Sequence, residues 1–154
     1  MIEKVISQRF YKTERWCKMG LFDKLKKKKE NNINFNEIIA ETIYDLKNNP
    51  EACTLAGGMK TEDGKITIPE SMLGEKLKKF IRYFYDSDLL DKEYLENEKK
   101  IIEKDINELT YKEVGTKLTS IIRGDRFCSG LIYSKVKDGT IFKLLERLQK
   151  VMNN

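Results

Sequence analysis

The sequence predicts a mainly α-helical domain of the α+β class, with about six helices, one small β-hairpin and a basic N-terminal arm. Three observations support this fold class. Apolar residues recur every three or four positions over most of the chain beyond residue 36, as on the buried face of a helix. An Asp-Gly pair between two β-branched segments indicates one hairpin. The 154 residues are enough for one domain with a sizeable core.

The first expected helix begins at Asn36, which would serve as its N-cap, and runs to about Lys47. Its apolar residues share one face: Ile39, Ile43 and Leu46. An Asn-Asn-Pro segment at residues 48–50 ends the helix, because the residue before a proline disfavours the helical conformation.

The hairpin is expected near residues 55–68, with its turn at Glu62-Asp63-Gly64. Pro69 would end the second strand, because proline has no backbone N–H to donate to a sheet. The helical pattern resumes at Ser71 and is interrupted at Asp86-Ser87-Asp88. Its apolar positions are Leu73, Leu77, Phe80, Ile81 and Phe84.

Asp91 is the expected N-cap of a charged helix that runs to about Asp105. The residues expected to face inward from it are Tyr94, Leu95, Ile101 and Ile102. Thr110 and Glu113 then form a capping box for a helix that Gly124 closes. The apolar face of that helix consists of Val114, Leu118, Ile121 and Ile122.

Two more helices complete the chain. A short one starts at Asp125 or Ser129 and ends at Asp138-Gly139. Thr140 would cap the last helix. Its apolar residues are in register: Ile141, Leu144, Leu145, Leu148 and Val151.

Histidine is absent from the sequence. This excludes Ser-His-Asp and Cys-His nucleophilic sites, HExxH zinc sites and histidine phosphotransfer. The cysteines Cys17, Cys53 and Cys128 cannot complete a Cys₄, Cys₃His or Cys₂His₂ zinc site. We therefore expect no cofactor and no metal. The odd number of cysteines favours a reducing, cytoplasmic location, and the sequence predicts no transmembrane segment.

The basic charge is concentrated in an N-terminal arm, residues 1–30. Residues 1–29 hold ten basic and three acidic residues, a net charge of +7, whereas residues 30–154 carry −2. Five lysines end the arm: Lys24, Lys26, Lys27, Lys28 and Lys29. A solvated leader is the favoured interpretation, a nucleic-acid-binding arm is the alternative, and contact with a membrane surface is less favoured. Met19 is an alternative start of the natural chain.

Arg123, Asp125 and Arg126 lie in a segment rich in charge and glycine between two apolar helices. As a binding site, this corner would present those three residues to a partner. As a structural corner, Asp125 would cap the next helix and pair with an arginine, Phe127 would fill the core, and Cys128 would be a buried thiol. The structural interpretation is the favoured one.

The densest acidic cluster comprises Asp86, Asp88, Asp91 and Glu93. Carboxylates can hold Mg²⁺ or Ca²⁺, and a histidine-free enzyme would have to rely on such groups. The cluster lacks the glycine at the sixth position of a calcium loop, and helix caps explain it without a metal. We therefore assign no catalytic residue and keep a carboxylate or metal enzyme as a third hypothesis.

The C-terminal stretch resembles the signature of a bacterial family catalogued as domain of unknown function 6508. The resemblance rests on Arg126-Phe127, Gly130, Asp138-Gly139-Thr140-Ile141 and the Leu-Leu-Glu-Arg-Leu segment at 144–148. It extends over about residues 36–150 and leaves the basic arm outside. Because the family has no established activity, the resemblance implies a fold and no function.

We predict an uncharacterised, non-enzymatic cytoplasmic protein of bacteria or their mobile elements that binds a protein partner. An inhibitor, an immunity protein and an accessory regulator all fit this description. The prediction rests on the absence of catalytic motifs in a small domain with an exposed charged appendage. Nucleic-acid binding through residues 1–29 is the second hypothesis.

Overall fold

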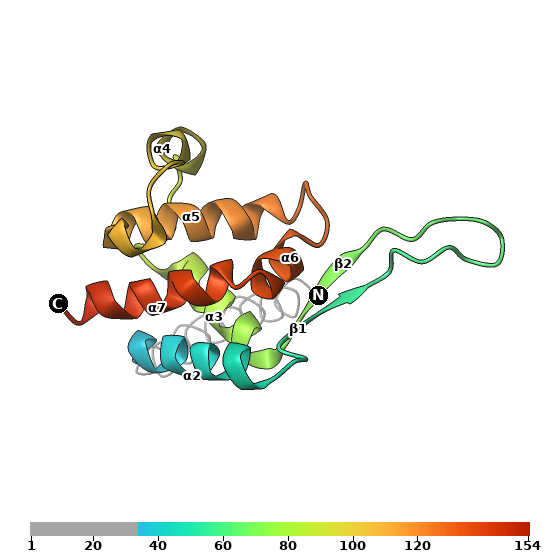
Figure 1. Cartoon of the computed structure of the whole chain (residues 1–154), viewed down its shortest axis with the longest axis horizontal. Helices are drawn as coiled ribbons and strands as arrows, with labels where there is room; N and C mark the ends of the chain where they lie inside the picture. The colour runs from blue at the N-terminus through green and yellow to red at the C-terminus, as the bar shows by residue number, and fades with distance from the viewer. Residues whose placement is uncertain (1–33) are drawn as a thin grey trace, which may run out of the picture. The chain divides into compact units, whose positions relative to one another are not determined.

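The computed structural model of the chain describes residues 34–154. This part is mainly α-helical, with six α-helices and one two-stranded antiparallel sheet, which confirms the predicted fold class (Figure 1). The basic arm, with Lys24 and Lys26 to Lys29, lies outside the described residues. No helix in the described part is long and apolar enough to cross a membrane.

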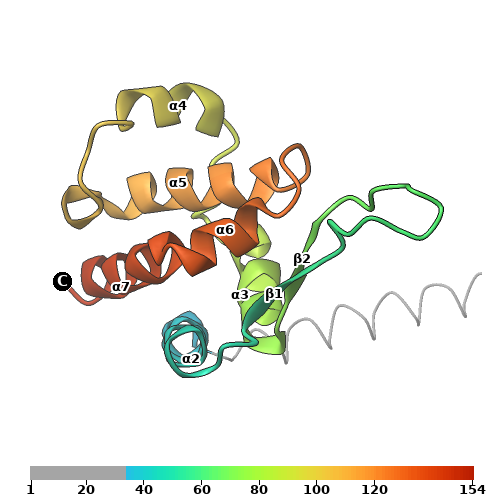
Figure 2. The same ribbon diagram turned by 45° about the vertical axis from the view of Figure 1, so that its right-hand side comes forward.

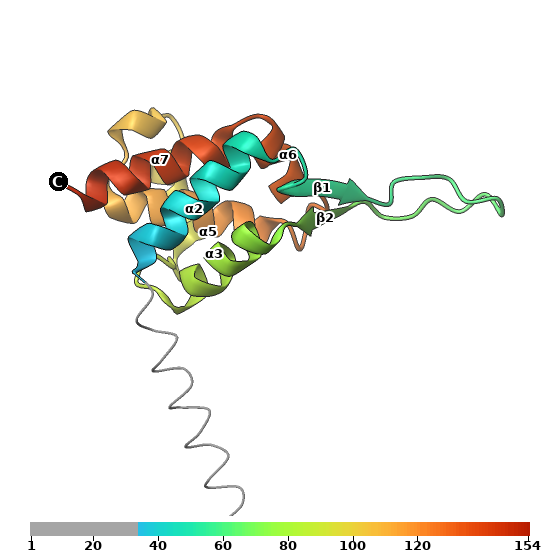
Figure 3. The same cartoon turned by 90° about the horizontal axis from the view of Figure 1, so that it is seen from below.

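Four helices enclose the core: α2 (Phe35–Asn48), α3 (Glu75–Asp86), α5 (Tyr111–Gly124) and α7 (Thr140–Met152). Helix α2 lies beside both α3 and α7, and α5 packs on α7 (Figure 3). The largest fully buried side chains come from these helices and the loops between them: Ile38, Ile39, Leu77, Phe80, Phe84, Leu89, Leu109, Val114, Leu118, Leu144, Leu145 and Leu148. Burial of these side chains is the main driving force for folding.

Helix α5 forms as the sequence predicts. The Thr110 hydroxyl accepts from the Glu113 backbone N–H, and the Glu113 carboxylate accepts from the Thr110 N–H, so both halves of the capping box are present. The predicted apolar face of α5 is buried in the core. At the same end, Arg147 of α7 donates from Nε to the Leu109 carbonyl oxygen at 2.8 Å.

The last two helices each follow a glycine with positive φ. Gly130 (φ +81°) precedes α6 (Leu131–Lys137), and Gly139 (φ +79°) precedes α7. The prediction that Thr140 caps α7 is wrong. Asp138 supplies the oxygen instead, accepting from the Thr140 backbone N–H at 2.8 Å, because the left-handed Gly139 turns the chain back toward that carboxylate.

The hairpin is longer than the sequence predicts. Its paired strands are β1 (Cys53–Ala56) and β2 (Glu70–Leu73), and the predicted arms form the distal loop beyond them. An isolated bridge between Lys60 and Ile66 continues the pairing into that loop. Pro69 therefore precedes the second strand instead of ending it. The hairpin extends away from the helices (Figures 1 and 2).

Two helices start at other residues than the sequence predicts, and in both cases a tertiary contact is the reason. Asn36 lies inside α2, because Phe35 is already helical and stacks on Phe80 with ring centroids 6.0 Å apart. Ser71 belongs to β2, so α3 begins only at Glu75. The chain turns at Gly74, whose N–H donates to the Ala52 carbonyl oxygen at 2.9 Å.

The predicted helix from Asp91 to Asp105 is shorter in the structure. Helix α4 spans Tyr94–Lys100, and a separate 3-10 helix covers Ile106–Glu108. The prediction of an inward face on this segment is half wrong. Ile101 is buried, and Leu95 and Ile102 are exposed.

The prediction that Phe127 fills the core and Cys128 is a buried thiol is also wrong. Phe127 is 88% exposed and Cys128 is exposed, whereas Cys53 is buried. The chain makes a tight turn after α5, in which the Phe127 and Cys128 N–H groups both donate to the Gly124 carbonyl oxygen. This turn directs both side chains away from the helices.

Replacement of Phe84 should be far more costly than replacement of Phe127. Phe84 is fully buried, so Phe84→Ala should lower the free energy of unfolding by about 3–5 kcal/mol. Phe127→Ala should change it by about 0.5 kcal/mol or less, because the ring is exposed. Urea unfolding followed by circular dichroism measures both values. Comparable losses in the two variants would contradict this arrangement of the core.

Candidate functional site

One carboxylate joins the hairpin to the helices. Asp125 Oδ1 accepts from the Ser71 hydroxyl of β2 at 3.0 Å and from the Ile132 backbone N–H of α6 at 2.9 Å. The Ser71 oxygen in turn accepts from the Tyr133 N–H at 3.1 Å. The predicted helix start at Asp125 or Ser129 is wrong, because α6 begins at Leu131 with Gly130 as its N-cap. Asp125 nevertheless accepts a hydrogen bond from the first turn of α6, as the capping prediction implied, and it also anchors the base of β2, which the sequence did not indicate.

The three predicted partner-binding residues have different surroundings. The Arg123 guanidinium lies over the Tyr94 ring of α4, 5.7 Å from its centroid, and the residue is half-buried. Asp125 is half-buried and forms no ion pair with an arginine within residues 34–154, contrary to the structural interpretation. Arg126 is exposed. Of the three, only Arg126 has an exposed side chain in the structure.

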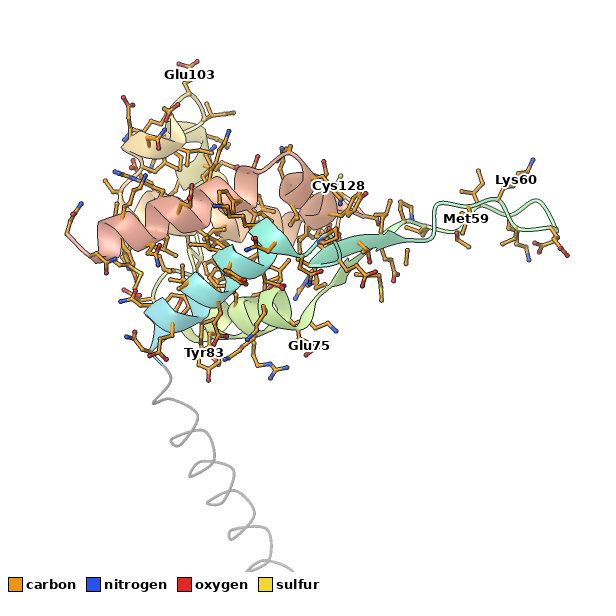
Figure 4. The ribbon with its side chains drawn as sticks, turned by 60° about the horizontal axis from the view of Figure 1, so that its bottom comes forward. Met59, Lys60, Glu75, Tyr83, Glu103 and Cys128 are labelled. Atoms are coloured by element: carbon orange, nitrogen blue, oxygen red, sulfur yellow. The ribbon has the colours of Figure 1, made fainter. Side chains whose placement is uncertain are left out.

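Large exposed apolar side chains gather on the hairpin and the adjacent corner. We define this hairpin patch by its members: Leu55, Met59, Ile66, Ile68, Met72 and Phe127. Ile66, Ile68 and Met59 are each more than 70% exposed. Figure 4 shows Met59 far out on the hairpin and Cys128, the neighbour of Phe127, near its base. The sequence predicts a hairpin here, but strand alternation does not reveal that both faces of its distal part are exposed.

The path of the hairpin depends on glycine at position 57. Gly57 has a φ of +80°, which L side chains rarely adopt. A Cβ atom there would also overlap the carbonyl oxygen of Ile68 in the opposite arm. Gly57 therefore lets the two arms approach each other where regular strand pairing stops.

A second candidate site is the cleft between α4 and α5, with a volume of about 520 Å³. Its walls come from the loop before α4, from α4 and from the first half of α5. The charged residues around it are of both signs: Asp88, Asp91, Lys92, Glu93, Lys100, Lys112 and Glu113. In Figure 2, α4 lies along α5 on the side away from α7. The structure brings Asp88, Asp91 and Glu93 of the acidic cluster into this cleft, and leaves Asp86 at the end of α3.

Asp91 is held by hydrogen bonds that use both of its oxygens. Oδ2 accepts from Thr116 at 2.7 Å and from the Asn97 amide at 3.0 Å, and Oδ1 accepts from the Glu93 N–H at 2.8 Å. Desolvation raises the pKa of Asp91, but these hydrogen bonds outweigh it, so the pKa is lowered from its ordinary value. The carboxylate therefore fixes the start of α4 on α5.

Asp88 is also engaged. It accepts from the Tyr111 hydroxyl at 2.7 Å and from Lys112 Nζ at 3.2 Å. Burial, and secondly the bond to Asp88, raise the pKa of Tyr111 to about 12. Within residues 34–154, no group of three or more Cys, Asp or Glu side chains is placed to hold a metal ion. Asp88 and Asp91 thus serve mainly to hold the loop before α4 against α5 through hydrogen bonds.

Among the comparisons with known proteins, one family model matches the chain. A family model described as a family of unknown function, DUF6508, matches residues 34–154. No curated protein and no solved structure matches the chain. The match confirms the resemblance seen in the sequence and extends it to the end of the chain.

Asp125→Ala should loosen the base of the hairpin. It leaves the Ile132 N–H and the Ser71 hydroxyl without their acceptor, which should lower the free energy of unfolding by about 1–3 kcal/mol. Cys53 on β1 should then be alkylated faster by iodoacetamide, as measured by peptide-resolved mass spectrometry. Asp125→Asn, which keeps the acceptor oxygen, is the matched control. Equal labelling of Cys53 in Asp125→Ala and wild type would show that the contact does not hold the hairpin.

Asp91 should make stability fall in acid. Because its pKa in the folded chain lies below the ordinary value of 3.8, its ionised form stabilises the fold above the unfolded pKa. This contribution should be complete above about pH 5 and should disappear as the pH falls through the native pKa. Urea unfolding of wild type and Asp91→Asn at several pH values tests it. The difference between the two should shrink on acidification; a constant difference would contradict the assignment.

Proposed function

The chain belongs to DUF6508, a family of unknown function, over residues 34–154, and on this premise we propose that it is a non-enzymatic protein that binds a protein partner through the hairpin patch. The observation that carries the proposal is the concentration of exposed apolar side chains on the protruding hairpin, with Phe127 on the turn after α5. Within the described residues, six of the nine large exposed apolar side chains belong to this patch. Clusters of this kind on a folded surface are typical of interaction sites.

The anchoring of the hairpin supports this role. A two-stranded ribbon is marginally stable by itself, but here its base is fixed to the helices by the buried Cys53 and by the contact between Ser71 and Asp125. The apolar side chains further out contribute little to the core, since Ile66 and Ile68 are mostly exposed. Their exposure is explained by contact with another protein.

The corner next to the hairpin would complete the contact surface. Phe127 supplies an exposed aromatic ring, and aromatic residues and arginine are enriched among residues that dominate binding energy. Arg126 is exposed beside it. The predicted role of Arg126 thus remains part of the proposal, whereas Arg123 and Asp125 would act by holding the corner in place.

Nucleic-acid binding stays a prediction for residues 1–29, which lie outside the described part. Residues 34–154 carry 20 basic and 21 acidic side chains, so this part has no excess of positive charge to attract phosphates. The hairpin segment, residues 51–73, holds four acidic and two basic residues. Charge therefore favours a protein partner at the hairpin patch.

The enzyme hypothesis receives less support from the geometry. Both oxygens of Asp91 accept hydrogen bonds within the protein, and Asp88 is bonded to Tyr111 and Lys112. These bonds within the protein occupy positions at which the two carboxylates would otherwise contact the proton of a substrate. We therefore rank the hypothesis of a carboxylate enzyme below that of partner binding.

Photo-crosslinking should locate the partner on the hairpin patch. With p-benzoylphenylalanine in place of Phe127 or Ile68, irradiation in a lysate of the source cells should give an adduct with the same protein at both positions. Both side chains are more than 70% exposed, so the replacements should not disturb folding. Lys143, exposed on α7, is the control position and should give no such adduct. The absence of adducts, or the same adduct from Lys143, would contradict the proposal.

A further inference from the structure

We propose that the cleft between α4 and α5 binds a small zwitterion, a molecule that carries an ammonium group, a carboxylate and an apolar side chain. A free amino acid and a dipeptide share this chemistry. Asp91 would bind the ammonium group, and Lys100 would bind the carboxylate. The cleft includes no residue of the hairpin patch, so its role as a ligand site is independent of the proposed function.

The cleft has the size and the apolar surface of a small-molecule site. Its volume of about 520 Å³ lies within the range of ligand-binding cavities. Leu89, Leu90 and Ile101 contribute apolar surface to its lining, and Leu89 and Ile101 are themselves part of the core. An apolar side chain of a ligand would be removed from water against these residues, which favours binding.

Charges of both signs line the cleft, and only some of them take part in ion pairs. Asp88 pairs with Lys112 at 3.2 Å, and Glu113 pairs with Lys104 at 2.6 Å. Within residues 34–154, the remaining charged side chains of the lining form no ion pair: Asp91, Glu93, Lys92 and Lys100. These comprise two of each sign, so they suit a ligand that carries both signs better than a ligand that carries only one.

Asp91 is held in place by the protein before a ligand binds. Its backbone N–H donates to the Thr119 hydroxyl oxygen at 3.1 Å, and its carboxylate accepts from the Thr116 hydroxyl at 2.7 Å. Both threonines are buried on α5. An acceptor that is fixed in advance loses little entropy on binding a ligand.

The Asp91 carboxylate retains its negative charge and room for a further donor. Its donors within the protein are a hydroxyl, a side-chain amide and a backbone N–H, which are all neutral. A carboxylate accepts about four hydrogen bonds, and Asp91 accepts three here. One position is therefore left for an N–H of an ammonium group.

Gly115 allows the loop before α4 to approach α5 closely. A Cβ atom at this position would overlap the carbonyl oxygen of Leu89. The chain continues from Leu89 to Asp91, so the close approach at Gly115 helps to place the carboxylate beside α5.

Lys100 supplies a positive charge from the last residue of α4. Its Nζ donates to Asn97 Oδ1 at 3.1 Å, which leaves other N–H groups of the ammonium free. Burial raises the pKa of Asp91, its hydrogen bonds lower it, and the charge of Lys100 lowers it further, so the two side chains are close enough to interact. They form no ion pair with each other. A zwitterion between them would pair with both.

Thermal melting and isothermal titration calorimetry of the full chain test the proposal. The probes are the apolar L-amino acids, one at a time, and the dipeptide leucylleucine, at millimolar concentration. At least one should raise the melting temperature and give a binding isotherm, because a ligand that binds the folded chain stabilises it. The amine and the carboxylic acid that correspond to the bound probe are the matched controls, for leucine 3-methylbutylamine and 4-methylpentanoate. Each should bind about tenfold more weakly or worse, because each lacks one charge-assisted hydrogen bond.

Two neighbouring lysines of α4 locate the site. Lys100→Gln should weaken binding of the probe by about tenfold, since it removes the charge that pairs with the carboxylate. Lys99→Gln makes the same charge change one residue away and should leave binding unchanged, because Lys99 pairs with Glu96 and does not line the cleft. Both lysines are exposed, so neither variant should alter the fold. Asp91→Asn should also weaken binding, but it loosens α4 as well, so the lysine pair is the decisive comparison.

Hydrogen exchange provides a second measurement. The bound probe should slow amide exchange in residues 92–101, because it would connect the loop before α4 to the end of that helix, and should leave residues 57–68 of the hairpin unchanged. The proposal is overturned if no probe binds, if the amine or the carboxylic acid binds as tightly as the zwitterion, or if Lys99→Gln weakens binding as much as Lys100→Gln. Protection of the hairpin instead of residues 92–101 would overturn it too. Adducts from the hairpin patch test the proposed function separately.

Discussion

The hydrogen bonds of the Asp125 carboxylate fix the position of the hairpin, and the candidate binding surface depends on that position. The same oxygen accepts from Ser71 of β2 and from the first turn of α6, so one atom connects the sheet to the helices. Burial first, and the charge of Asp125 second, raise the pKa of the nearby Cys53 thiol. The base of the hairpin is therefore part of the folded core, although its distal part contacts solvent.

The two sides of α5 are joined to the rest of the chain by different physical means. Toward α7, α5 contributes apolar side chains such as Val114 and Leu118 that are fully buried. Toward α4, the contacts are polar, as in the 2.6 Å hydrogen bond from Ser120 to Glu98, and α4 itself has no buried residue. Apolar burial stabilises without directional requirements, whereas a typical polar hydrogen bond depends on its geometry and contributes only about 0.5–1.5 kcal/mol net. The helical core and the cleft thus differ in how firmly they are held.

Local signals explain how much of this fold could be predicted. The capping box at Thr110 and Glu113 and the apolar period of α5 and α7 are encoded within a few neighbouring residues, and both formed as predicted. The extent of the hairpin could not be predicted, because Ser71 is drawn into β2 by Asp125, 54 residues away. Phe127 was placed in the core because its apolarity is visible in the sequence. The turn that directs it outward is not.

In the candidate sites, too, residue types could be predicted from the sequence and tertiary contacts could not. The sequence identified Asp88 and Asp91 as members of an acidic cluster, since residue type and spacing suffice for that, but it did not indicate that Arg126 is exposed. Their partners Tyr111, Lys112 and Thr116 lie on another helix, so only the fold reveals that the carboxylates are engaged.

The hairpin is held to the helices at its base, and its distal loop projects from them. A small rotation at the Ser71 contact displaces the distal loop much further than it displaces the base. The stiffness of the Ser71 contact therefore determines how large a volume the tip of the hairpin samples before a partner binds. A stiff joint reduces the entropy lost on association, and a loose one widens the range of approach directions. If the hairpin binds a partner as proposed, Asp125 would influence that binding through the position of the hairpin, without contacting the partner itself.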